Sequence, residues 1–164
     1  MADATFSFAP AASDSARWAL AQYFDELAER FTEGFDVESA LDEAMHDYEP
    51  PLGLLVVAEA DGDIVGCGAI HWIDGDTGEI KRMWISADHR GVGLGRALLA
   101  HLERVVLGSG RTRVLLDTNE SLTEAIAMYR AAGYLPVERY NDNPHAHLWF
   151  AKQLAPSAQR SSER

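Results

Sequence analysis

The first fifty residues place their hydrophobic side chains with the spacing of amphipathic helices. The first helix carries these side chains at Leu20, Phe24, Leu27 and Phe31. Their spacing of four, three and four residues puts them on one face of a helix, and Gly34 is placed to end it. Asp36 can cap a second helix, and the Pro-Pro pair at 50–51 forbids its continuation. Two helices are therefore predicted here, after a short irregular start.

Beyond residue 53 the pattern changes to short apolar runs separated by turn residues, which is typical of strands. Asp61-Gly62 lies between the first two runs and is a strong hairpin signal. Ser121 to Glu124 has the sequence of a capping box, and Gly133 follows the helix that this box would open. The predicted strands cover residues 54–60, 64–73, 79–85, 113–117, 135–140 and 147–152. One predicted helix begins at Leu94 and stops near Gly108, and another covers 121–132.

The order of these elements favours a single α/β fold. Two helices are followed by three strands, and then a helix, a strand, a helix and two strands complete the series. Such an order points to one mixed sheet with helices on its faces. Since no repeat or linker interrupts it, residues 1–154 are expected to form one domain. The polar residues 155–164 are expected to be a disordered tail.

The composition is that of an ordinary globular chain. It has 164 residues, of which 47% are hydrophobic and 24% charged. No apolar run approaches the roughly 20 residues that span a bilayer, and no secretion signal is recognisable at the start. Cys67 is the only cysteine, which excludes an intramolecular disulfide and a cysteine-based zinc site. We therefore expect a cytoplasmic protein with no membrane partner and no metal.

The charge is divided unevenly along the chain. A net charge of −12 argues against nucleic acid as a partner. Residues 1–50 contain twelve acidic and two basic residues, a net −10. Residues 81–113 contain seven basic and two acidic residues, a net +5. One region is thus suited to a cation and another to an anion, although both could simply be solvated faces.

A glycine-rich turn between a strand and a helix forms a candidate anion site. The first N–H groups of a helix have no internal partners and lie at the positive end of its dipole. Gly91, Gly93 and Gly95 allow a diphosphate to approach the backbone. Arg90 and Arg96 flank the turn and are best explained by a phosphate between them. The alternative is a flexible turn with incidental arginines, and the spacing matches neither GxGxxG nor a P-loop.

Two motifs in this chain strongly resemble those of the GNAT superfamily of N-acetyltransferases. The first is the strand Glu79-Ile-Lys-Arg-Met-Trp-Ile85 followed by residues 90–99, in which Arg90, Gly93 and Gly95 occupy the signature positions. The second consists of Asn119 and residues 125–134. The resemblance covers residues 14–153. It implies the GNAT fold, with about six to seven strands and about four helices, and direct acetyl transfer from acetyl-CoA to an amine.

The resemblance also implies which residues bind acetyl-CoA. The loop 90–96 would bind the pyrophosphate, and the backbone of 83–85 would pair with the pantetheine arm and polarise the thioester carbonyl. Asn119 would contact the cofactor arm, although a turn or cap role is an equal alternative. The implied cofactor-binding residues are Met83, Trp84, Ile85, Arg90, Gly91, Val92, Gly93, Leu94, Gly95, Arg96 and Asn119.

Tyr129 matches the family tyrosine that protonates the departing thiolate. A phenol with an ordinary pKa of about 10 is protonated at neutral pH and can donate. The alternative is a core aromatic on its helix. Glu79 is the candidate general base, as in many relatives, but it could instead pair with Lys81. The rivals for the role of base are His71, Asp76, His145 and His147.

In the family that these motifs resemble, the first two helices and the loop before the last strand usually shape the acceptor pocket. The acidic first fifty residues would then lie beside the substrate, so the acceptor is expected to be a small cationic amine. The loop 140–149 and the side chains of His71, His145 and His147 are candidate contacts with this substrate. A protein or peptide acceptor, or a longer acyl donor, is an alternative. A non-catalytic acyl-CoA-binding module and a nucleotide-binding regulator are others, and homodimers are common in the family.

Overall fold

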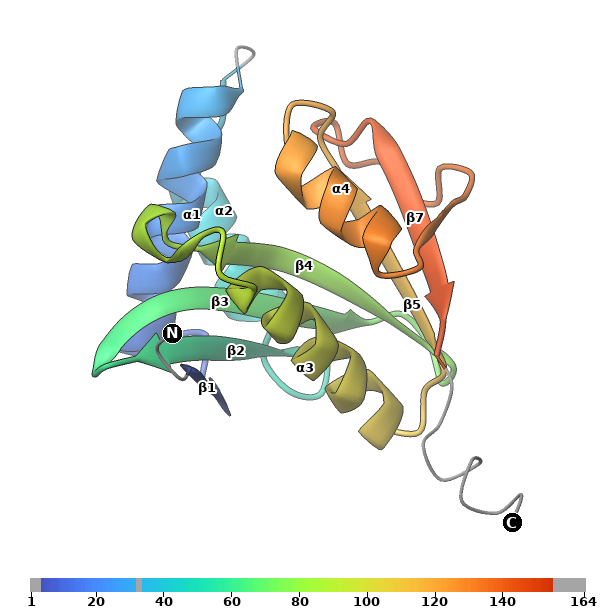
Figure 1. Ribbon diagram of the computed structural model, residues 1–164, viewed down its shortest axis with the longest axis horizontal. Coiled ribbons are helices and arrows are strands. Elements are labelled where there is room, and N and C mark those ends of the chain that lie inside the picture. The colour runs from blue at the N-terminus through green and yellow to red at the C-terminus, as the bar shows by residue number, and fades with distance from the viewer. Residues whose placement is uncertain (1–3, 32–33, 155–164) are drawn as a thin grey trace. The chain divides into compact units, whose positions relative to one another are not determined.

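The structure is a computed structural model that describes residues 4–31 and 34–154. Seven strands form one mixed sheet in the order β1-β2-β3-β4-β5-β7-β6 (Figure 1). The strands are β1 (Ala4–Phe8), β2 (Gly53–Ala60), β3 (Asp63–Trp72), β4 (Thr77–Ile85), β5 (Arg113–Thr118), β6 (Leu135–Pro136) and β7 (Leu148–Gln153). The helices are α1 (Asp14–Arg30), α2 (Val37–Asp47), α3 (Leu94–Gly108) and α4 (Thr123–Ala131), with a 3-10 turn at Ala87–His89. The predicted mixed α/β fold is confirmed.

The chain divides into two compact parts. The first part comprises residues 1–71 and 80–102, and the second comprises residues 72–79 and 103–164. Most of β4 and the start of α3 therefore belong to the first part, and the remainder of each belongs to the second. The single domain over 1–154 stays a prediction. The expected disordered tail at 155–164 lies outside the described residues.

The first part contains the predicted hairpin between β2 and β3. Asp61 and Gly62 both have positive φ, at 53° and 85°. Positive φ values at both central residues are typical of a type I′ turn, whose twist matches that of the paired strands. Asp61 tolerates this conformation because its short polar side chain can bond locally. The hairpin prediction from Asp61-Gly62 is confirmed.

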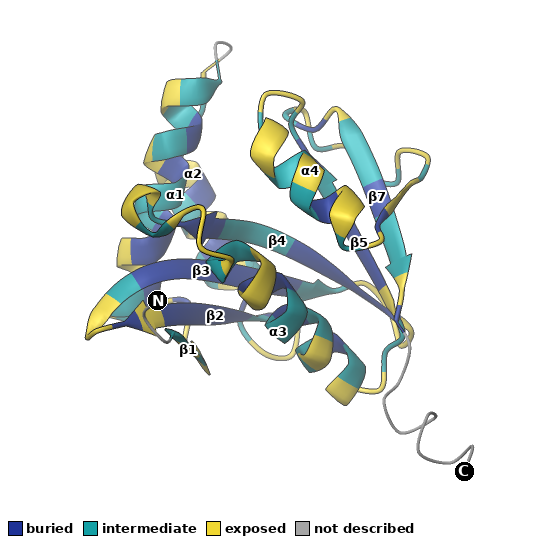
Figure 2. Ribbon diagram, viewed as in Figure 1, coloured by how far each residue is buried: buried dark blue, intermediate teal, exposed yellow. Residues whose placement is uncertain are grey.

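Helices cover both faces of the sheet in the first part. Helix α3 lies on one face of β2–β4, and α1 and α2 lie on the other (Figure 1). The buried residues lie mainly in the strands, which are largely dark blue in Figure 2. Phe24 of α1 is fully buried, and the Arg82 guanidinium of β4 lies 5.1 Å from the centre of its ring. Asp36 caps α2 as predicted, since its carboxylate accepts the Ser39 N–H at 3.1 Å.

The expectation of an irregular start was wrong, because residues 4–8 form β1. This strand pairs antiparallel with β2, and Phe6 lies opposite Ala58. Phe6 also packs against a small cluster of Ala58, Ala60 and Val65. The alternation of Thr5 and Ser7 with Phe6 and Phe8 has the period of a strand. Five residues at the start of the described chain are a weak signal until β2 supplies a partner.

Two local predictions in the second part were also wrong. Helix α4 begins at Thr123 after a Leu122 cap that makes no side-chain cap hydrogen bond, so the capping box does not form. The Ser121 N–H instead donates to Asn119 Oδ1 at 2.9 Å, which turns the chain earlier. The strand predicted at 135–140 ends at Pro136. Gly133, with φ at 97°, ends the helix region as expected.

The second part has β5 at its centre. Residues 77–79 of β4 pair with it in parallel, and β7 pairs with it antiparallel along its whole length. Helix α4 packs on this sheet through Tyr129, whose ring lies 6.3 Å from Phe150 and 5.9 Å from Tyr134. The Tyr134 hydroxyl donates to Glu103 at 2.8 Å, and Lys152 pairs with the same carboxylate at 3.0 Å. Burial, followed by the charge of Glu103, raises the pKa of Tyr134.

Replacing Gly66 by alanine is expected to lower stability. A Cβ at Gly66 would lie 2.6 Å from the Trp84 carbonyl oxygen and 2.8 Å from Ile85 Cδ1. Such overpacking costs about 1–3 kcal/mol. Gly75→Ala is the matched control, because nothing lies within 4 Å of a Cβ there. Urea unfolding should show a lower midpoint for Gly66→Ala alone, and equal midpoints would contradict the packing of β3 against β4.

Cys67 is expected to be inert in the folded protein. Its side chain is fully buried, and burial raises the pKa of the thiol to about 12, despite the lowering effect of the Arg82 charge. Since the thiolate is the reactive form, Ellman's reagent at pH 8 should detect no thiol in the native chain and one after denaturation. Rapid labelling of the native chain would show that β3 opens readily.

Candidate active site

The glycine turn after β4 has the backbone of an anion site. Gly91 and Gly93 have φ values of 84° and 87°, which side chains other than glycine rarely adopt. An added Cβ at either position would meet no atom within 4 Å. Glycine is therefore required here by backbone conformation, and the space outside the turn is open. Residues 91–93 are exposed, so a ligand can reach their backbone.

The turn leads directly into the N-terminus of α3. The first helical hydrogen bond runs from the Ala97 N–H to the Gly93 carbonyl at 3.0 Å. The N–H groups of residues 94–96 consequently have no partner one turn earlier in the helix. The positive end of the dipole of this 15-residue helix lies at the same place. These donors, with the exposed Arg96 beside them, suit the pyrophosphate group of a coenzyme.

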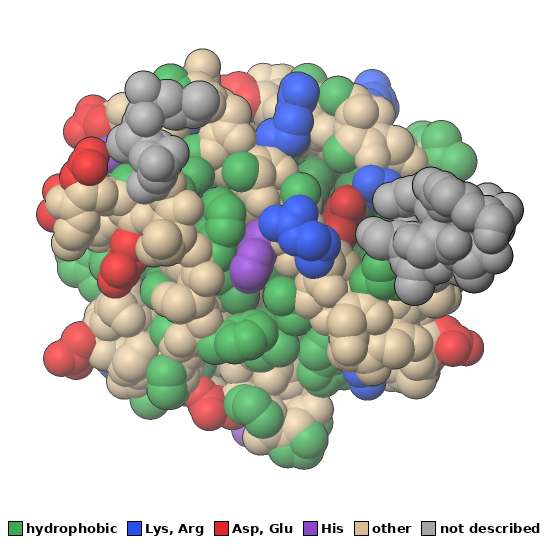
Figure 3. All heavy atoms as spheres, turned by 60° about the horizontal axis from the view of Figure 1, so that its bottom comes forward, with side chains coloured by type: hydrophobic (Ala, Val, Ile, Leu, Met, Phe, Trp, Pro, Cys, Tyr) green, Lys and Arg blue, Asp and Glu red, His purple; other side chains and the backbone are tan. Residues whose placement is uncertain are grey.

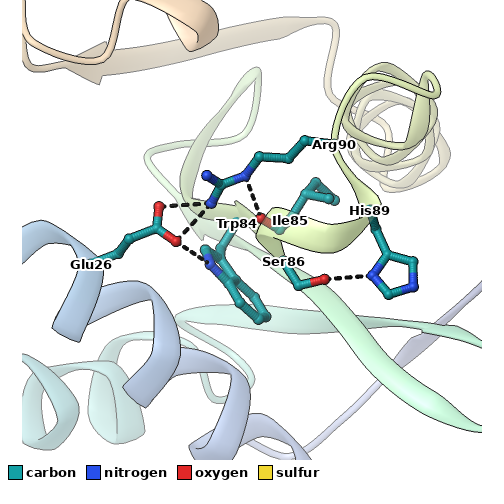
Figure 4. Close-up of polar contacts among 6 residues, drawn as sticks. All are labelled: Glu26, Trp84, Ile85, Ser86, His89 and Arg90. Atoms are coloured by element: carbon teal, nitrogen blue, oxygen red, sulfur yellow. Dashed lines mark hydrogen bonds and ion pairs between the residues drawn. The ribbon is translucent and has the colours of Figure 1, made fainter.

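Arg90 is fixed by two contacts at the end of β4 (Figure 4). Its Nε donates to the Ile85 carbonyl at 2.9 Å. Its Nη2 lies 2.7 Å from both carboxylate oxygens of Glu26, a residue of α1. Glu26 Oε1 also accepts the indole N–H of Trp84 at 3.2 Å. Glu26 thus connects α1 to the β4 segment and the glycine turn, a role that no sequence pattern indicated.

The segment 83–85 follows an irregular residue in β4. Arg82 has φ at 56°, a left-handed conformation inside a strand. One such residue interrupts the regular ladder and bends the strand, as in a β-bulge. After it, Trp84 and Ile85 are buried, and the Ser86 N–H donates to the Val65 carbonyl at 2.8 Å. The proposed pairing of this backbone with a pantetheine arm stays a prediction.

The second part surrounds Glu79 with hydrogen-bond donors. Glu79 is only 4% exposed. The Tyr140 hydroxyl donates to Glu79 Oε2 at 2.7 Å, and Asn141 Nδ2 lies 3.3 Å from the same oxygen. Asn141 Nδ2 also donates to Asp117 Oδ2 at 2.6 Å. Burial, reinforced by the charge of Glu79, raises the pKa of Tyr140, so its phenol stays protonated and acts as a donor.

Sequence reasoning identified Glu79 and the loop 140–149, but not the connection between them. Tyr140, Asn141 and Asp117 were missed as individual residues. A buried carboxylate requires donors, and this requirement was the only signal that could have pointed to them. The alternative pairing of Glu79 with Lys81 stays a prediction.

Tyr129 has the packing of a core aromatic, with 7% of its surface exposed. Its T-shaped contact with Tyr134 and its contact with Phe150 place it against β7. This packing agrees with the alternative role of Tyr129 as a core aromatic, and it also fixes the position of the ring. A general acid must be positioned, so a fixed ring is compatible with either role. The acid role of Tyr129 stays a prediction.

Asn119, His145 and His147 lie together in the loops that flank β5 and β7. Asn119 Nδ2 donates to the His145 carbonyl at 2.7 Å, while its oxygen accepts the Ser121 N–H. His147 Nδ1 accepts the Glu120 N–H at 3.2 Å. These contacts fit the alternative role of Asn119 as a turn residue. Its contact with the cofactor stays a prediction.

The other two candidate bases occupy different positions. His71 lies in β3 of the first part, where it is paired with Gly53 of β2. The Asp76 carbonyl accepts the Thr112 and Arg113 N–H groups, both at 3.1 Å. Asp76 therefore has a backbone role in the turn before β4. Their roles as alternative general bases stay predictions.

Charged side chains form no continuous basic surface on the face shown in Figure 3. Acidic and basic groups lie scattered among hydrophobic and uncharged ones over the part of this face that the structure describes. Within residues 4–31 and 34–154, no group of three or more His, Cys, Asp or Glu residues is arranged to bind a metal ion. No helix in the same ranges is long and apolar enough to cross a membrane.

Comparison with known proteins decides the family. The Acetyltransferase (GNAT) family matches residues 20–134. The chain belongs to the GNAT acetyltransferases. This GNAT chain is 32% identical to an IAA acetyltransferase of Azospirillum brasilense over 140 residues, which cover 83% of this chain and 91% of the relative. It is 29% identical to an uncharacterized N-acetyltransferase of Schizosaccharomyces pombe, over 71% of this chain and 73% of that protein.

Solved structures show the same fold. A GNAT acetyltransferase of Staphylococcus aureus matches with a TM-score of 0.78 at 16% identity, over 93% of this chain and all of that one. A GNAT acetyltransferase of Elizabethkingia anophelis, solved with acetyl-CoA bound, matches with a TM-score of 0.67 at 18% identity, over 92% and 98% of the two chains. The predicted GNAT fold and the acyltransferase class are confirmed.

Proposed function

We propose that this GNAT enzyme transfers the acetyl group of acetyl-CoA directly to the primary amine of a small cationic molecule. The observation that carries the proposal is the glycine turn at the start of α3. Its positive φ values, exposed backbone and helix N-terminus provide an anion site. The bound acetyl-CoA in the Elizabethkingia relative supports the pyrophosphate of this coenzyme as the anion.

In this proposal the cofactor supplies an activated thioester, and the chain binds and orients it. The N–H groups of residues 91–96 and the guanidinium groups of Arg90 and Arg96 bind the pyrophosphate. The backbone of 83–85 pairs with the pantetheine arm and donates to the thioester oxygen. A donor fixed at the developing oxyanion stabilises the transition state more than the ground state. Asn119 completes the cofactor contacts.

Two side chains of the second part carry the proton transfers. Glu79 accepts a proton from the acceptor ammonium, directly or through water, so that the amine can attack the thioester. Tyr129 donates its hydroxyl proton to the departing thiolate, and the second proton that the attacking nitrogen loses restores the phenol through solvent. The nitrogen–carbon bond forms first and gives a tetrahedral oxyanion, whose collapse breaks the carbon–sulphur bond, and no covalent enzyme intermediate occurs. The burial of Glu79 supports this role, since active sites place acids and bases away from water.

The charges favour a cationic acceptor. Exposed acidic residues on α1 and α2, including the cap of α2, are Asp14, Asp25, Glu29, Asp36, Glu38, Asp42 and Glu43. Their summed field attracts cations even where each carboxylate is solvated. We also propose that the protein is cytoplasmic, because its single cysteine offers no intramolecular disulfide framework. A homodimer is compatible with this proposal.

An amine screen that monitors free thiol tests the proposed reaction. Polyamines and basic amino acids are expected to release coenzyme A faster than neutral or anionic amines. With the best acceptor, Tyr129→Phe and Glu79→Gln should each lower kcat by about 10²–10⁴-fold, as expected for the loss of a general acid or base. Because Cys67 is buried, the native chain should add no thiol background.

The same screen separates the alternatives. It includes a peptide with a free N-terminus, longer acyl donors, and IAA, because the Azospirillum relative is called an IAA acetyltransferase. Turnover of only neutral or anionic acceptors would overturn the cationic acceptor. Acetyl-CoA binding without thiol release would indicate a non-catalytic module. Calorimetric binding of ATP or NAD in place of coenzyme A would indicate a nucleotide-binding regulator.

The ion pair between Arg90 and Glu26 bears on cofactor affinity. Arg90 is a proposed pyrophosphate ligand, and the Glu26 carboxylate lies 2.7 Å from its Nη2. The side chains are 43% and 33% exposed, so the pair contributes little to stability. A carboxylate at this position nevertheless repels an incoming diphosphate and competes with it for the guanidinium.

Glu26→Gln is therefore expected to tighten acetyl-CoA binding about two- to fivefold at low salt, which corresponds to a surface charge interaction. Calorimetry measures the dissociation constant, and the gain should shrink as salt is added. Glu29→Gln is the matched control, because it removes the same charge from an exposed position of α1. Weaker binding by Glu26→Gln would show instead that Glu26 positions Arg90 for the cofactor.

A further inference from the structure

Asn141 lies at the centre of the polar cluster in the second part. It belongs to the chain between β6 and β7. Its Nδ2 contacts Glu79 Oε2 at 3.3 Å and Asp117 Oδ2 at 2.6 Å. Its Oδ1 accepts the indole N–H of Trp149 at 3.0 Å and the Asn143 N–H at 3.3 Å. Both ends of the amide are therefore engaged.

These partners fix which way the amide of Asn141 points. An indole N–H and a backbone N–H can only donate, so the atom that faces Trp149 and Asn143 must be the oxygen. The NH2 group then necessarily faces Glu79 and Asp117. The orientation follows from the partners and does not depend on distinguishing nitrogen from oxygen.

The amide solves an electrostatic problem for the two carboxylates. Glu79 and Asp117 come from β4 and β5, whose parallel pairing extends as far as Glu79 and Leu115. They share one nitrogen donor, and like charges held so close repel each other. An NH2 group between them offers one hydrogen to each and limits the separation of the two side chains. Glu79 is buried, so it has little water to replace this donor.

We propose that Asn141 is a positioning residue for acetyl transfer, which holds Oε2 of Glu79 and so sets the place where the carboxylate meets the acceptor amine. The Tyr140 hydroxyl, 2.7 Å from the same oxygen, assists it. The proposal rests on the proposed function of Glu79 as base. A base displaced by about 1 Å from its productive geometry costs on the order of 10²-fold in rate.

The chain offers a matched control in Asn143. This residue lies in the same loop, and its Nδ2 donates to Asp117 Oδ1 at 3.2 Å. Its oxygen accepts the His145 N–H at 3.0 Å. Like Asn141, Asn143 therefore accepts a backbone N–H of the loop and donates to Asp117. The contact with Glu79 distinguishes Asn141, since Asn143 makes none among the hydrogen bonds described here.

The test compares Asn141→Asp and Asn143→Asp by steady-state kinetics. Asn141→Asp keeps the shape but replaces the shared donor by a carboxylate, and kcat should fall about 10²-fold. The KM for acetyl-CoA should stay within about twofold of the parent value, because the change leaves the glycine turn intact. Asn143→Asp should lower kcat by less than about threefold. Asn141→Ala adds no charge and should reproduce the loss if the aspartate variant folds poorly.

Combination with Glu79→Gln separates positioning from a structural role. If Asn141 acts through Glu79, then Asn141→Ala should cost nothing further in the Glu79→Gln background. The positioning role is overturned if the two losses multiply, if Asn143→Asp loses as much kcat as Asn141→Asp, or if Asn141→Ala keeps full kcat while Glu79→Gln loses it. Full kcat in Glu79→Gln overturns the base assignment itself, and the role of Asn141 with it.

Discussion

Burial of the Glu79 carboxylate constrains much of the second part. Removing an ionised group from water costs several kcal/mol unless hydrogen bonds replace the water, and Glu79 is 4% exposed. The loop before β7 meets this need, because Tyr140 and Asn141 donate to Oε2. The chain therefore leaves the strand pattern after Pro136 and turns these side chains towards β4. The irregular loop thus supplies the donors that the buried Glu79 carboxylate requires.

The first part depends on a different physical constraint, the orphan N–H groups at the start of α3. Two glycines with positive φ bring the chain from β4 into the helix so that these donors remain exposed. The salt bridge from Arg90 to Glu26 then ties this turn to α1.

Most of the fold followed from local patterns in the sequence. The Asp61-Gly62 hairpin, the Asp36 cap and the glycine stop at Gly133 were predicted correctly, because each depends on the intrinsic backbone preference of one or two residues. The capping box at Ser121 failed because Asn119 competed for the same N–H. Strand β1 was missed because so short a run becomes a strand only through its pairing with β2.

The sequence by itself determined the family, the order of most elements and the glycine turn, because these depend on residues that are neighbours along the chain. Tertiary structure alone decided the partners of the charged groups. Glu26 meets Arg90 across 64 positions, and Asn141 meets Glu79 across 62. No periodicity or propensity specifies such pairs, since they arise only when packing removes a charge from water and leaves one donor or acceptor within reach.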